Sequence, residues 1–230
     1  KIEATMTTNA LTNVNGKWIG DETSGELKQD GTFLTLKSNS PGTPFNARYD
    51  CTTPDGQDWY FQVKLNTIPK NSCISVGVVN PEEMLPGWKT RGMFFNGNLT
   101  NGGAALVTAF GPYPKEGDSV GVFVTNSNQD VTFYVNEKCL GTGFSLGPRG
   151  GKVFCPCIQV SGEATVEFVI PDTLPSVVMT REQATQGVSD EWKLIQAINE
   201  TGRAVHVPEG REIVLHLDES VAKFDLSIRV

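Results

Sequence analysis

Between residues 32 and 169 the chain alternates short apolar runs with turn residues, and this alternation constrains the fold more than any other feature. In the run at residues 60–65, Phe61, Val63 and Leu65 alternate with polar residues, which places the three apolar side chains on one face of a strand. No stretch between the runs has the period of a helix. Together with 24 Gly and 13 Pro, the pattern predicts an all-β fold, an antiparallel sandwich of two sheets.

The flanking segments divide the chain into four parts. Residues 1–31 are polar with only isolated large apolar side chains, so we expect an N-terminal extension that packs on the sandwich. Residues 32–171 hold the sandwich itself. Residues 172–190 lack periodicity and contain Pro175 and Gly187, which is typical of a linker. Residues 191–230 hold three strand-like runs and predict a small C-terminal β region.

The charge and the cysteine content limit which partners and which cellular compartment we expect. The formal net charge is −7 and no basic patch is visible, which argues against nucleic acid. No apolar run approaches the roughly 20 residues of a membrane-spanning helix, and the N-terminus lacks the apolar centre of a signal peptide. The cysteines are odd in number and scattered, so we expect no disulfide framework and a cytoplasmic location. They are Cys51, Cys73, Cys139, Cys155 and Cys157.

Residues suited to nucleophilic or metal chemistry are few. The only histidines, His206 and His216, lie beyond the expected sandwich. A serine or cysteine within the sandwich is therefore not expected to have a histidine base nearby. Cys155 and Cys157 share one face of a strand, but no zinc-type ligand pattern accompanies them, and we expect them to be buried core residues. The sequence therefore predicts no catalytic residue, no cofactor and no metal site.

Two alternatives involving sugars stay open. Glu163 and Glu167 share a strand face, but strand rise separates them by about 13 Å, which is too far for paired glycoside hydrolysis. A lectin-like sandwich could hold a sugar through the asparagines Asn96, Asn98 and Asn101, although turn formation explains these residues more simply. A carbohydrate-binding module or a glycoside hydrolase is thus the alternative to a protein-binding function.

Residues 32–170 resemble a SPRY domain, the core of the B30.2 module. Six segments follow one another in the order typical of that family: Trp59 to Lys64 (WYFQVK), Val76 to Val79 (VGVV), Gly87-Trp88 with Phe95 to Gly97, Glu116 to Val122 (EGDSVGV), Thr132 to Asn136 with Leu140-Gly141, and Phe154 to Ile158. The resemblance implies a bent, concanavalin-like antiparallel sandwich without catalytic activity. It also implies that edge loops bind partner proteins, often through short extended peptides.

The hairpin at residues 131–146 departs from the family pattern in its turn. Asn136-Glu137 stands where the family usually has Asn-Gly, and Glu tolerates a positive φ poorly. We therefore expect a longer or differently shaped loop. Phe133, Val135 and Phe144 are expected in the core, which would make the hairpin part of the scaffold.

Residues 190–230 resemble the opening strands of a META domain, a small β fold without an agreed activity. The resemblance rests on Glu191 to Leu194 (EWKL), residues 199–202, Val207-Pro208 and Ile213 to Leu217 (IVLHL). It implies that only the first part of such a domain is present.

The resemblance to SPRY domains also implies a set of partner-binding residues. By position these are Asp50, Thr53 and Asp55 in the loop at residues 50–56, Phe94 before a turn, and Val160, Ser161 and Gly162 near the last strand pair. The chain departs from the family twice. The first loop lacks an arginine, and Ser161 stands where an aromatic residue is common.

A second candidate surface follows from the residues themselves. Met84, Leu85, Trp88 and Arg91 lie in or near a proline-flanked loop, and Tyr113 stands between two prolines. Such residues suit the centre of an interface, because binding hot spots favour Trp, Tyr and Arg. The competing interpretation is that Trp88 folds under the loop as core. The sequence thus predicts a non-enzymatic module that binds an extended peptide of a partner protein.

Overall fold

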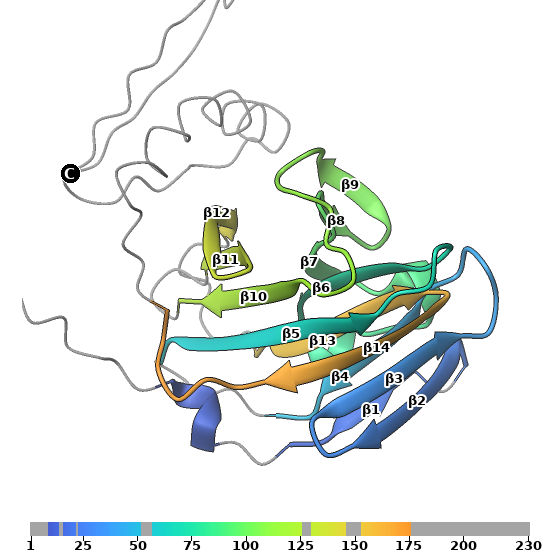
Figure 1. Cartoon of the computed structure of the whole chain (residues 1–230), viewed down its shortest axis with the longest axis horizontal. Helices are drawn as coiled ribbons and strands as arrows, with labels where there is room; N and C mark the ends of the chain where they lie inside the picture. The colour runs from blue at the N-terminus through green and yellow to red at the C-terminus, as the bar shows by residue number, and fades with distance from the viewer. Residues whose placement is uncertain are drawn as a thin grey trace, which may run out of the picture.

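The computed structural model describes residues 9–13, 16–21, 23–51, 57–125, 130–145 and 153–175, and the statements below concern these residues. Their strands form two antiparallel seven-stranded sheets (Figure 1). Sheet 1 has the order β1 (Trp18–Gly20), β4 (Phe45–Tyr49), β13 (Cys155–Ser161), β6 (Cys73–Val79), β7 (Gly92–Phe95), β8 (Leu99–Asn101) and β9 (Ala104–Val107). Sheet 2 has the order β12 (Lys138–Ser145), β11 (Asp130–Val135), β10 (Ser119–Val124), β5 (Trp59–Thr67), β14 (Glu163–Val169), β3 (Phe33–Ser38) and β2 (Gly25–Asp30).

Besides the strands, the described residues form three short 3-10 helices: η1 (Ala10–Asn13), η2 (Pro81–Glu83) and η3 (Gly87–Lys89). The predicted all-β, two-sheet sandwich is confirmed. The part of the chain that the structure describes contains no helix with the length and apolar character needed to span a membrane.

The core lies between the sheets, where the period-two strands direct their apolar sides. Phe61, Val63 and Leu65 on β5 are almost fully buried, as the alternation predicts. From the hairpin, Phe133, Val135 and Phe144 join the same core, which confirms their expected place. Burial of these apolar side chains is the main force that holds the two sheets together.

The N-terminal segment is more than an extension that packs on the sandwich. Residues 18–20 form β1 at one edge of sheet 1, and residues 25–30 form β2 at one edge of sheet 2. Ahead of them, Asn9 is fully buried and bridges two distant parts of the chain. Its Nδ2 donates to the carbonyl oxygens of Tyr60 and Pro171, each at 2.7 Å. Its own N–H donates to the Asp172 carbonyl at 3.0 Å.

The hairpin between β11 and β12 turns in two residues with the backbone conformation usual for such a turn, so the expectation of a longer or differently shaped loop was wrong. Val135 pairs with Lys138, and both Asn136 (φ 50°) and Glu137 (φ 65°) adopt the left-handed conformation. Contacts outside the hairpin fix this turn. Asn136 Nδ2 donates to Asp118 Oδ1 at 2.9 Å, and its Oδ1 accepts from the Ser119 N–H at 2.9 Å. These bonds offset the strain at Glu137.

Several sequence-based expectations fall on residues 176–230, outside the described residues. They are the greater part of the linker, the small C-terminal β region with its resemblance to a META domain, and the positions of His206 and His216. Thr53 and Asp55 also lie outside the described residues.

Candidate functional site

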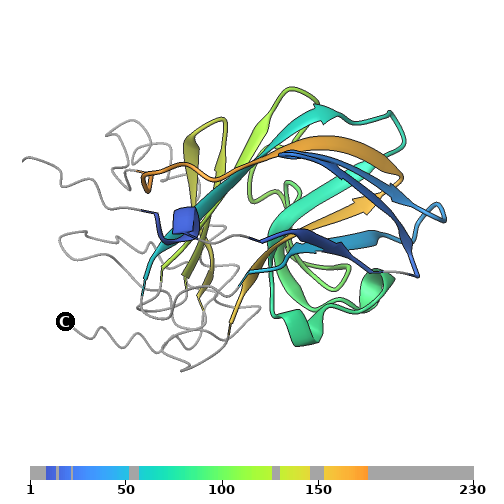
Figure 2. The same ribbon diagram turned by 90° about the horizontal axis from the view of Figure 1, so that it is seen from below.

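The loop between β6 and β7 folds back over the outer face of sheet 1, the face that points away from the sandwich core. Met84 in this loop packs on Val79, Phe94 and Cys157, which are all fully buried on that face. In Figure 2 the two short turns of this loop, in green, lie outside the sheet. The loop therefore forms a third layer over part of sheet 1.

Asn46 on β4 fixes the position of this loop. Its side chain is fully buried, and Nδ2 donates to the carbonyl oxygens of Leu85 at 3.1 Å and Gly87 at 3.0 Å. Nδ2 also contacts Asp21 Oδ2 at 3.1 Å, and Oδ1 accepts from Gln159 Nε2 at 2.9 Å. Because both the oxygen and the nitrogen of the Asn46 amide form hydrogen bonds, the orientation of the amide is determined and the loop is held in one position.

Trp88 stands at the surface of this loop and is held there firmly. Its side chain is 47% exposed, and its indole N–H donates to the Gly42 carbonyl at 2.6 Å. The ring lies against Gly103, where a Cβ atom would come within 2.5 Å of ring atom Cε3. Leu85 beside it in the loop is 46% exposed. The structure thus decides against a buried Trp88, and because the indole N–H is already used, the ring offers a partner mainly its apolar surface.

The turn under Trp88 leads into β9, the strand at the open edge of sheet 1. Gly102 (φ 55°) and Gly103 (φ 80°) form a two-residue hairpin turn between β8 and β9, with Asn101 opposite Ala104. The pair that flanks such a turn exchanges hydrogen bonds, so in the next pair, Thr100 and Ala105, the main-chain groups point outward. Within the described residues, β9 has no strand on its other side. The N–H and C=O of Ala105 therefore face away from the sheet.

A second exposed ring lies at the opposite end of β8. Tyr113 is 67% exposed and rests on Gly97, where a Cβ atom would lie 2.7 Å from the ring. Its hydroxyl contacts Asn98 Oδ1 at 3.3 Å, and the same oxygen accepts from the Ala109 N–H at 2.8 Å. Trp88 at the β8–β9 turn and Tyr113 at the β7–β8 turn thus flank the hairpin that carries the open edge.

The residues named by position in the SPRY resemblance do not meet in one place. Arg48 on β4 lies opposite Cys157 on β13, so Asp50, two residues later, falls opposite Cys155. Ser161 lies six residues beyond Cys155 on β13, which separates Asp50 from Ser161 by about 20 Å along the strands. Phe94 and Val160 are fully buried. Ser161 and Gly162 form the turn between β13 and β14, beside Ser72.

By contrast, the structure gathers most of the second candidate surface. Leu85, Trp88 and the exposed Arg91 lie in the loop over sheet 1, and Arg91 approaches Gly102 in the β8–β9 turn. Met84 belongs to the same loop but points inward. Sequence reasoning missed the edge strand β9. The tripeptide Asn101-Gly102-Gly103 between Leu99-Thr100 and Ala104–Val107 was the signal for that hairpin.

Three of the residues considered for sugar chemistry, Glu167, Asn96 and Asn98, have structural roles. Glu167 forms an ion pair with Lys64 at 3.2 Å. Asn96 Oδ1 accepts from the Asn98 N–H at 3.2 Å, and Asn98 in turn orders the segment around Ala109. Among the described residues no cluster of three or more His, Cys, Asp or Glu side chains could hold a metal ion.

Comparisons with known proteins agree with this architecture. The family model of the SPRY domain matches residues 58–173. The SPRY domain of human HERC1 has a TM-score of 0.51 at 15% identity and covers 66% of this chain and 97% of that domain. The TRIM65 PSpry domain (TM-score 0.46, 14% identity, 70% and 96% covered) and the Drosophila melanogaster neuralized NHR1 domain (0.44, 15%, 67% and 98%) are similar as well.

No curated protein sequence matches the chain. The likeness to the HERC1 domain, at this low identity, shows the fold alone, whereas the family model covers half of the sequence. The chain belongs to the SPRY domain family.

Proposed function

We propose that this SPRY domain is a non-enzymatic interaction module that binds an extended peptide segment of a partner protein along β9, between Trp88 and Tyr113. The observation that carries the proposal is the clustering of exposed apolar side chains. Of the four large apolar residues at the surface of the described chain, three (Leu85, Trp88 and Tyr113) lie around the β7–β9 region, and only Phe33 lies elsewhere. Such clusters around a polar rim are typical of binding surfaces.

The edge of β9 supports an extended ligand. An edge strand with free N–H and C=O groups is a template for another strand, and folded proteins usually protect it with charges. The edge strand β2 has such protection in Glu26, Lys28 and Asp30, whereas β9 has only Ala104, Ala105, Leu106 and Val107. A peptide that pairs with the outward N–H and C=O of Ala105 would extend toward both rings.

The two rings would supply the anchors. Trp88 is fixed by its bond to Gly42 and Tyr113 by its contact with Asn98, so neither ring has to be ordered on binding. Arg91 at the β8–β9 turn adds a positive charge beside Trp88. We therefore expect a ligand with an apolar or proline side chain against Trp88 and an acidic residue near Arg91.

The test is selection of ligands from a library of peptides that represents natural protein sequences, followed by affinity measurement. Replacing Trp88 with alanine is expected to weaken binding on the order of tenfold to a hundredfold, the range of a hot-spot residue. The matched control is Phe33→Ala, because Phe33 is 49% exposed but lies on β3 of the other sheet. Equal loss in both variants, or none in Trp88→Ala, would contradict the proposed site.

The binding mode has a separate readout. The Ala105 amide is expected to exchange its hydrogen rapidly in the free protein and slowly in the complex, because only the bound peptide accepts from it. An Ala105→Pro variant, which lacks that donor while the Asn101–Ala104 pair is retained, is expected to bind more weakly at unchanged thermal stability. If a selected peptide binds and leaves the Ala105 amide unprotected, strand addition is wrong even though the surface is correct.

A further inference from the structure

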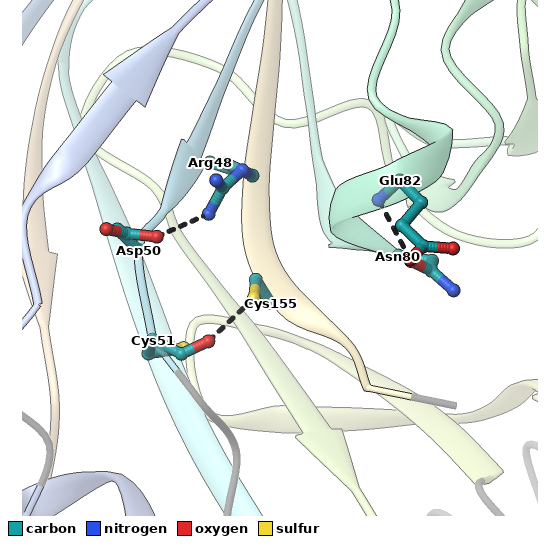
Figure 3. A network of polar contacts seen from close by, with 6 residues as sticks. All are labelled: Arg48, Asp50, Cys51, Asn80, Glu82 and Cys155. Atoms are coloured by element: carbon teal, nitrogen blue, oxygen red, sulfur yellow. Dashed lines mark hydrogen bonds and ion pairs between the residues drawn. The ribbon is translucent and has the colours of Figure 1, made fainter. Parts of the chain in front are cut away.

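Two cysteines far apart in the sequence meet where β4 ends and β13 begins (Figure 3). The Cys155 sulfur lies 3.0 Å from the carbonyl oxygen of Cys51, a residue 104 positions away. Cys155 is fully buried, and Cys51 is 9% exposed. Both are free thiols.

The strand register explains this meeting. Arg48 on β4 lies opposite Cys157 on β13, so two residues further on Asp50 falls opposite Cys155. The chain then bends, since the Cys51 N–H donates to the Tyr49 carbonyl at 3.0 Å. This tight turn places Cys51 beside Cys155, and Figure 3 shows the contact between the Cys51 carbonyl and the Cys155 sulfur next to the Arg48–Asp50 ion pair.

The local environment differentiates the two thiols. A hydrogen bond from the Cys51 thiol lowers the pKa of Cys155 to about 7, against the opposing effect of burial, and the Arg48 guanidinium lowers it further. The same hydrogen bond, together with burial, raises the pKa of Cys51. Cys155 is therefore the thiol that ionises near neutral pH and reacts first, and Cys51 is the neighbour that can respond.

From this geometry we infer that Cys51 and Cys155 form an intramolecular disulfide when the protein meets a peroxide. The Cys155 thiolate attacks one peroxide oxygen, the O–O bond breaks, and a sulfenic acid and hydroxide form. The Cys51 sulfur then attacks the Cys155 sulfur, the S–O bond breaks, and water leaves. In total two thiols are oxidised to one S–S bond while hydrogen peroxide is reduced to two waters.

The other cysteines are placed so that they do not compete. Cys157 lies on the same strand face as Cys155 but two residues along, about 7 Å away, at the upper limit for a disulfide, and burial raises its pKa. Cys73 pairs with Ser161 at the opposite end of β13. Cys139 packs on the outer face of sheet 2. The cross-link is thus expected to be specific for one pair.

The experiment is stepwise oxidation of the purified chain with hydrogen peroxide, followed by blocking of free thiols and peptide mapping by mass spectrometry. The expected product is two hydrogens lighter and contains a Cys51–Cys155 cross-link. Variants Cys51→Ser and Cys155→Ser are expected to lose it, whereas Cys73→Ser and Cys139→Ser keep it. A protein in which Cys73 is oxidised while Cys51 and Cys155 stay reduced, or in which another pair is linked, overturns the inference.

Two further measurements do not depend on the variants. Because only the thiolate reacts, the oxidation rate is expected to fall on the order of fifty-fold between about pH 7 and about pH 5. The cross-link closes a loop of 104 residues, so Tm of the oxidised protein is expected to rise by at least about 5 °C. A rate that does not change with pH, or a lower Tm after oxidation, contradicts the inferred chemistry or geometry.

Discussion

Each sheet has a buried patch on its outer face, and the two patches are held by opposite chemistry. Sheet 1 presents a polar row across neighbouring strands, in which side-chain hydrogen bonds join Asp21 to Asn46, Asn46 to Gln159, and Ser75 to Asn96. Its members are Asp21, Asn46, Gln159, Ser75 and Asn96. Sheet 2 presents an aromatic cluster of Tyr60, Phe123 and Tyr134, on which Cys139 and Leu174 pack. One face is held by directional bonds and the other by apolar contact.

The difference has a structural consequence. The polar row binds main-chain oxygens of the loop over sheet 1, so it fixes that loop in one position and presents Trp88 outward. The aromatic cluster, in which the rings of Tyr60 and Tyr134 meet edge to face at 5.6 Å, contributes burial but little direction. Hydrogen bonds specify geometry more sharply than apolar contact does.

The strongest test of the comparison removes the centre of the polar row. Asn46→Ala is expected to lower the free energy of unfolding by about 3 to 5 kcal/mol, because it leaves Gln159 Nε2 and two loop carbonyls without their partner and removes the side-chain bond to Asp21. Chemical denaturation measures this. In the matched control on sheet 2, Gln62→Ala removes one bond to the Tyr60 hydroxyl and is expected to cost about 1 kcal/mol or less. Similar costs for both would mean that the polar row has no special role.

Alkaline pH is expected to act on the aromatic face. Burial raises the pKa of Tyr60 and Tyr134, so the folded protein keeps both protons where the unfolded chain loses them. Their contribution is complete below about pH 10 and decreases above it, by roughly 1.4 kcal/mol for Tyr134 at pH 11. Urea denaturation at both pH values measures this. The decrease should be smaller in Tyr134→Phe by that amount, and an unchanged decrease in that variant would exclude Tyr134 as a source.

A smaller change loosens the loop without breaking the row. Thr90 Oγ1 bonds to both the N–H and the carbonyl of Leu85, and the Leu85 N–H lies at 3.1 Å. Thr90→Val keeps the shape and is expected to cost about 1.5 kcal/mol. Faster hydrogen exchange of the Leu85 amide would locate the effect. Thr132→Val, which breaks a hydroxyl contact on sheet 2, is the control expected to leave that amide unchanged.

The smallest effect on the free energy of unfolding is expected from removing the Tyr134 hydroxyl. The Tyr134 hydroxyl is buried without an N or O hydrogen-bond partner among the described residues, and the Cys139 thiol lies against it. Tyr134→Phe is therefore expected to be neutral or to stabilise by about 0.5 kcal/mol near neutral pH. Tyr60→Phe, which breaks the bond from Gln62, should destabilise by a similar amount. Thermal melts of the two variants distinguish the signs.

Local pattern predicted the strands well, because alternation such as Phe61, Val63 and Leu65 depends only on neighbours in sequence. It failed at the Asn136-Glu137 turn, where the stabilising contacts come from Asp118 and Ser119, which lie 18 and 17 positions before Asn136. Long-range contacts decide such cases, and they cannot be read from a short window.

The candidate site shows the same limit. Its exposed side chains were named from the sequence, but the exposure of Trp88 depends on Gly42, 46 positions earlier, and on the glycine turn at Gly103. The positions taken from the SPRY resemblance were separated by the sheet itself, because the loop after Tyr49 and the turn at Gly162 lie at opposite ends of sheet 1. The open edge of β9 emerged only when the sheet order was known.

The bridge made by Asn9 has an architectural consequence. By bonding to Tyr60 and Pro171 it brings the entry and exit of the sandwich to one spot, where η1 and the end of β14 lie side by side in both views (Figures 1 and 2). Domains with adjoining ends tolerate insertion into a surface loop of another protein. This fold therefore suits insertion between two secondary-structure elements of a host protein, because the two ends of the inserted domain would leave the host's own elements close together.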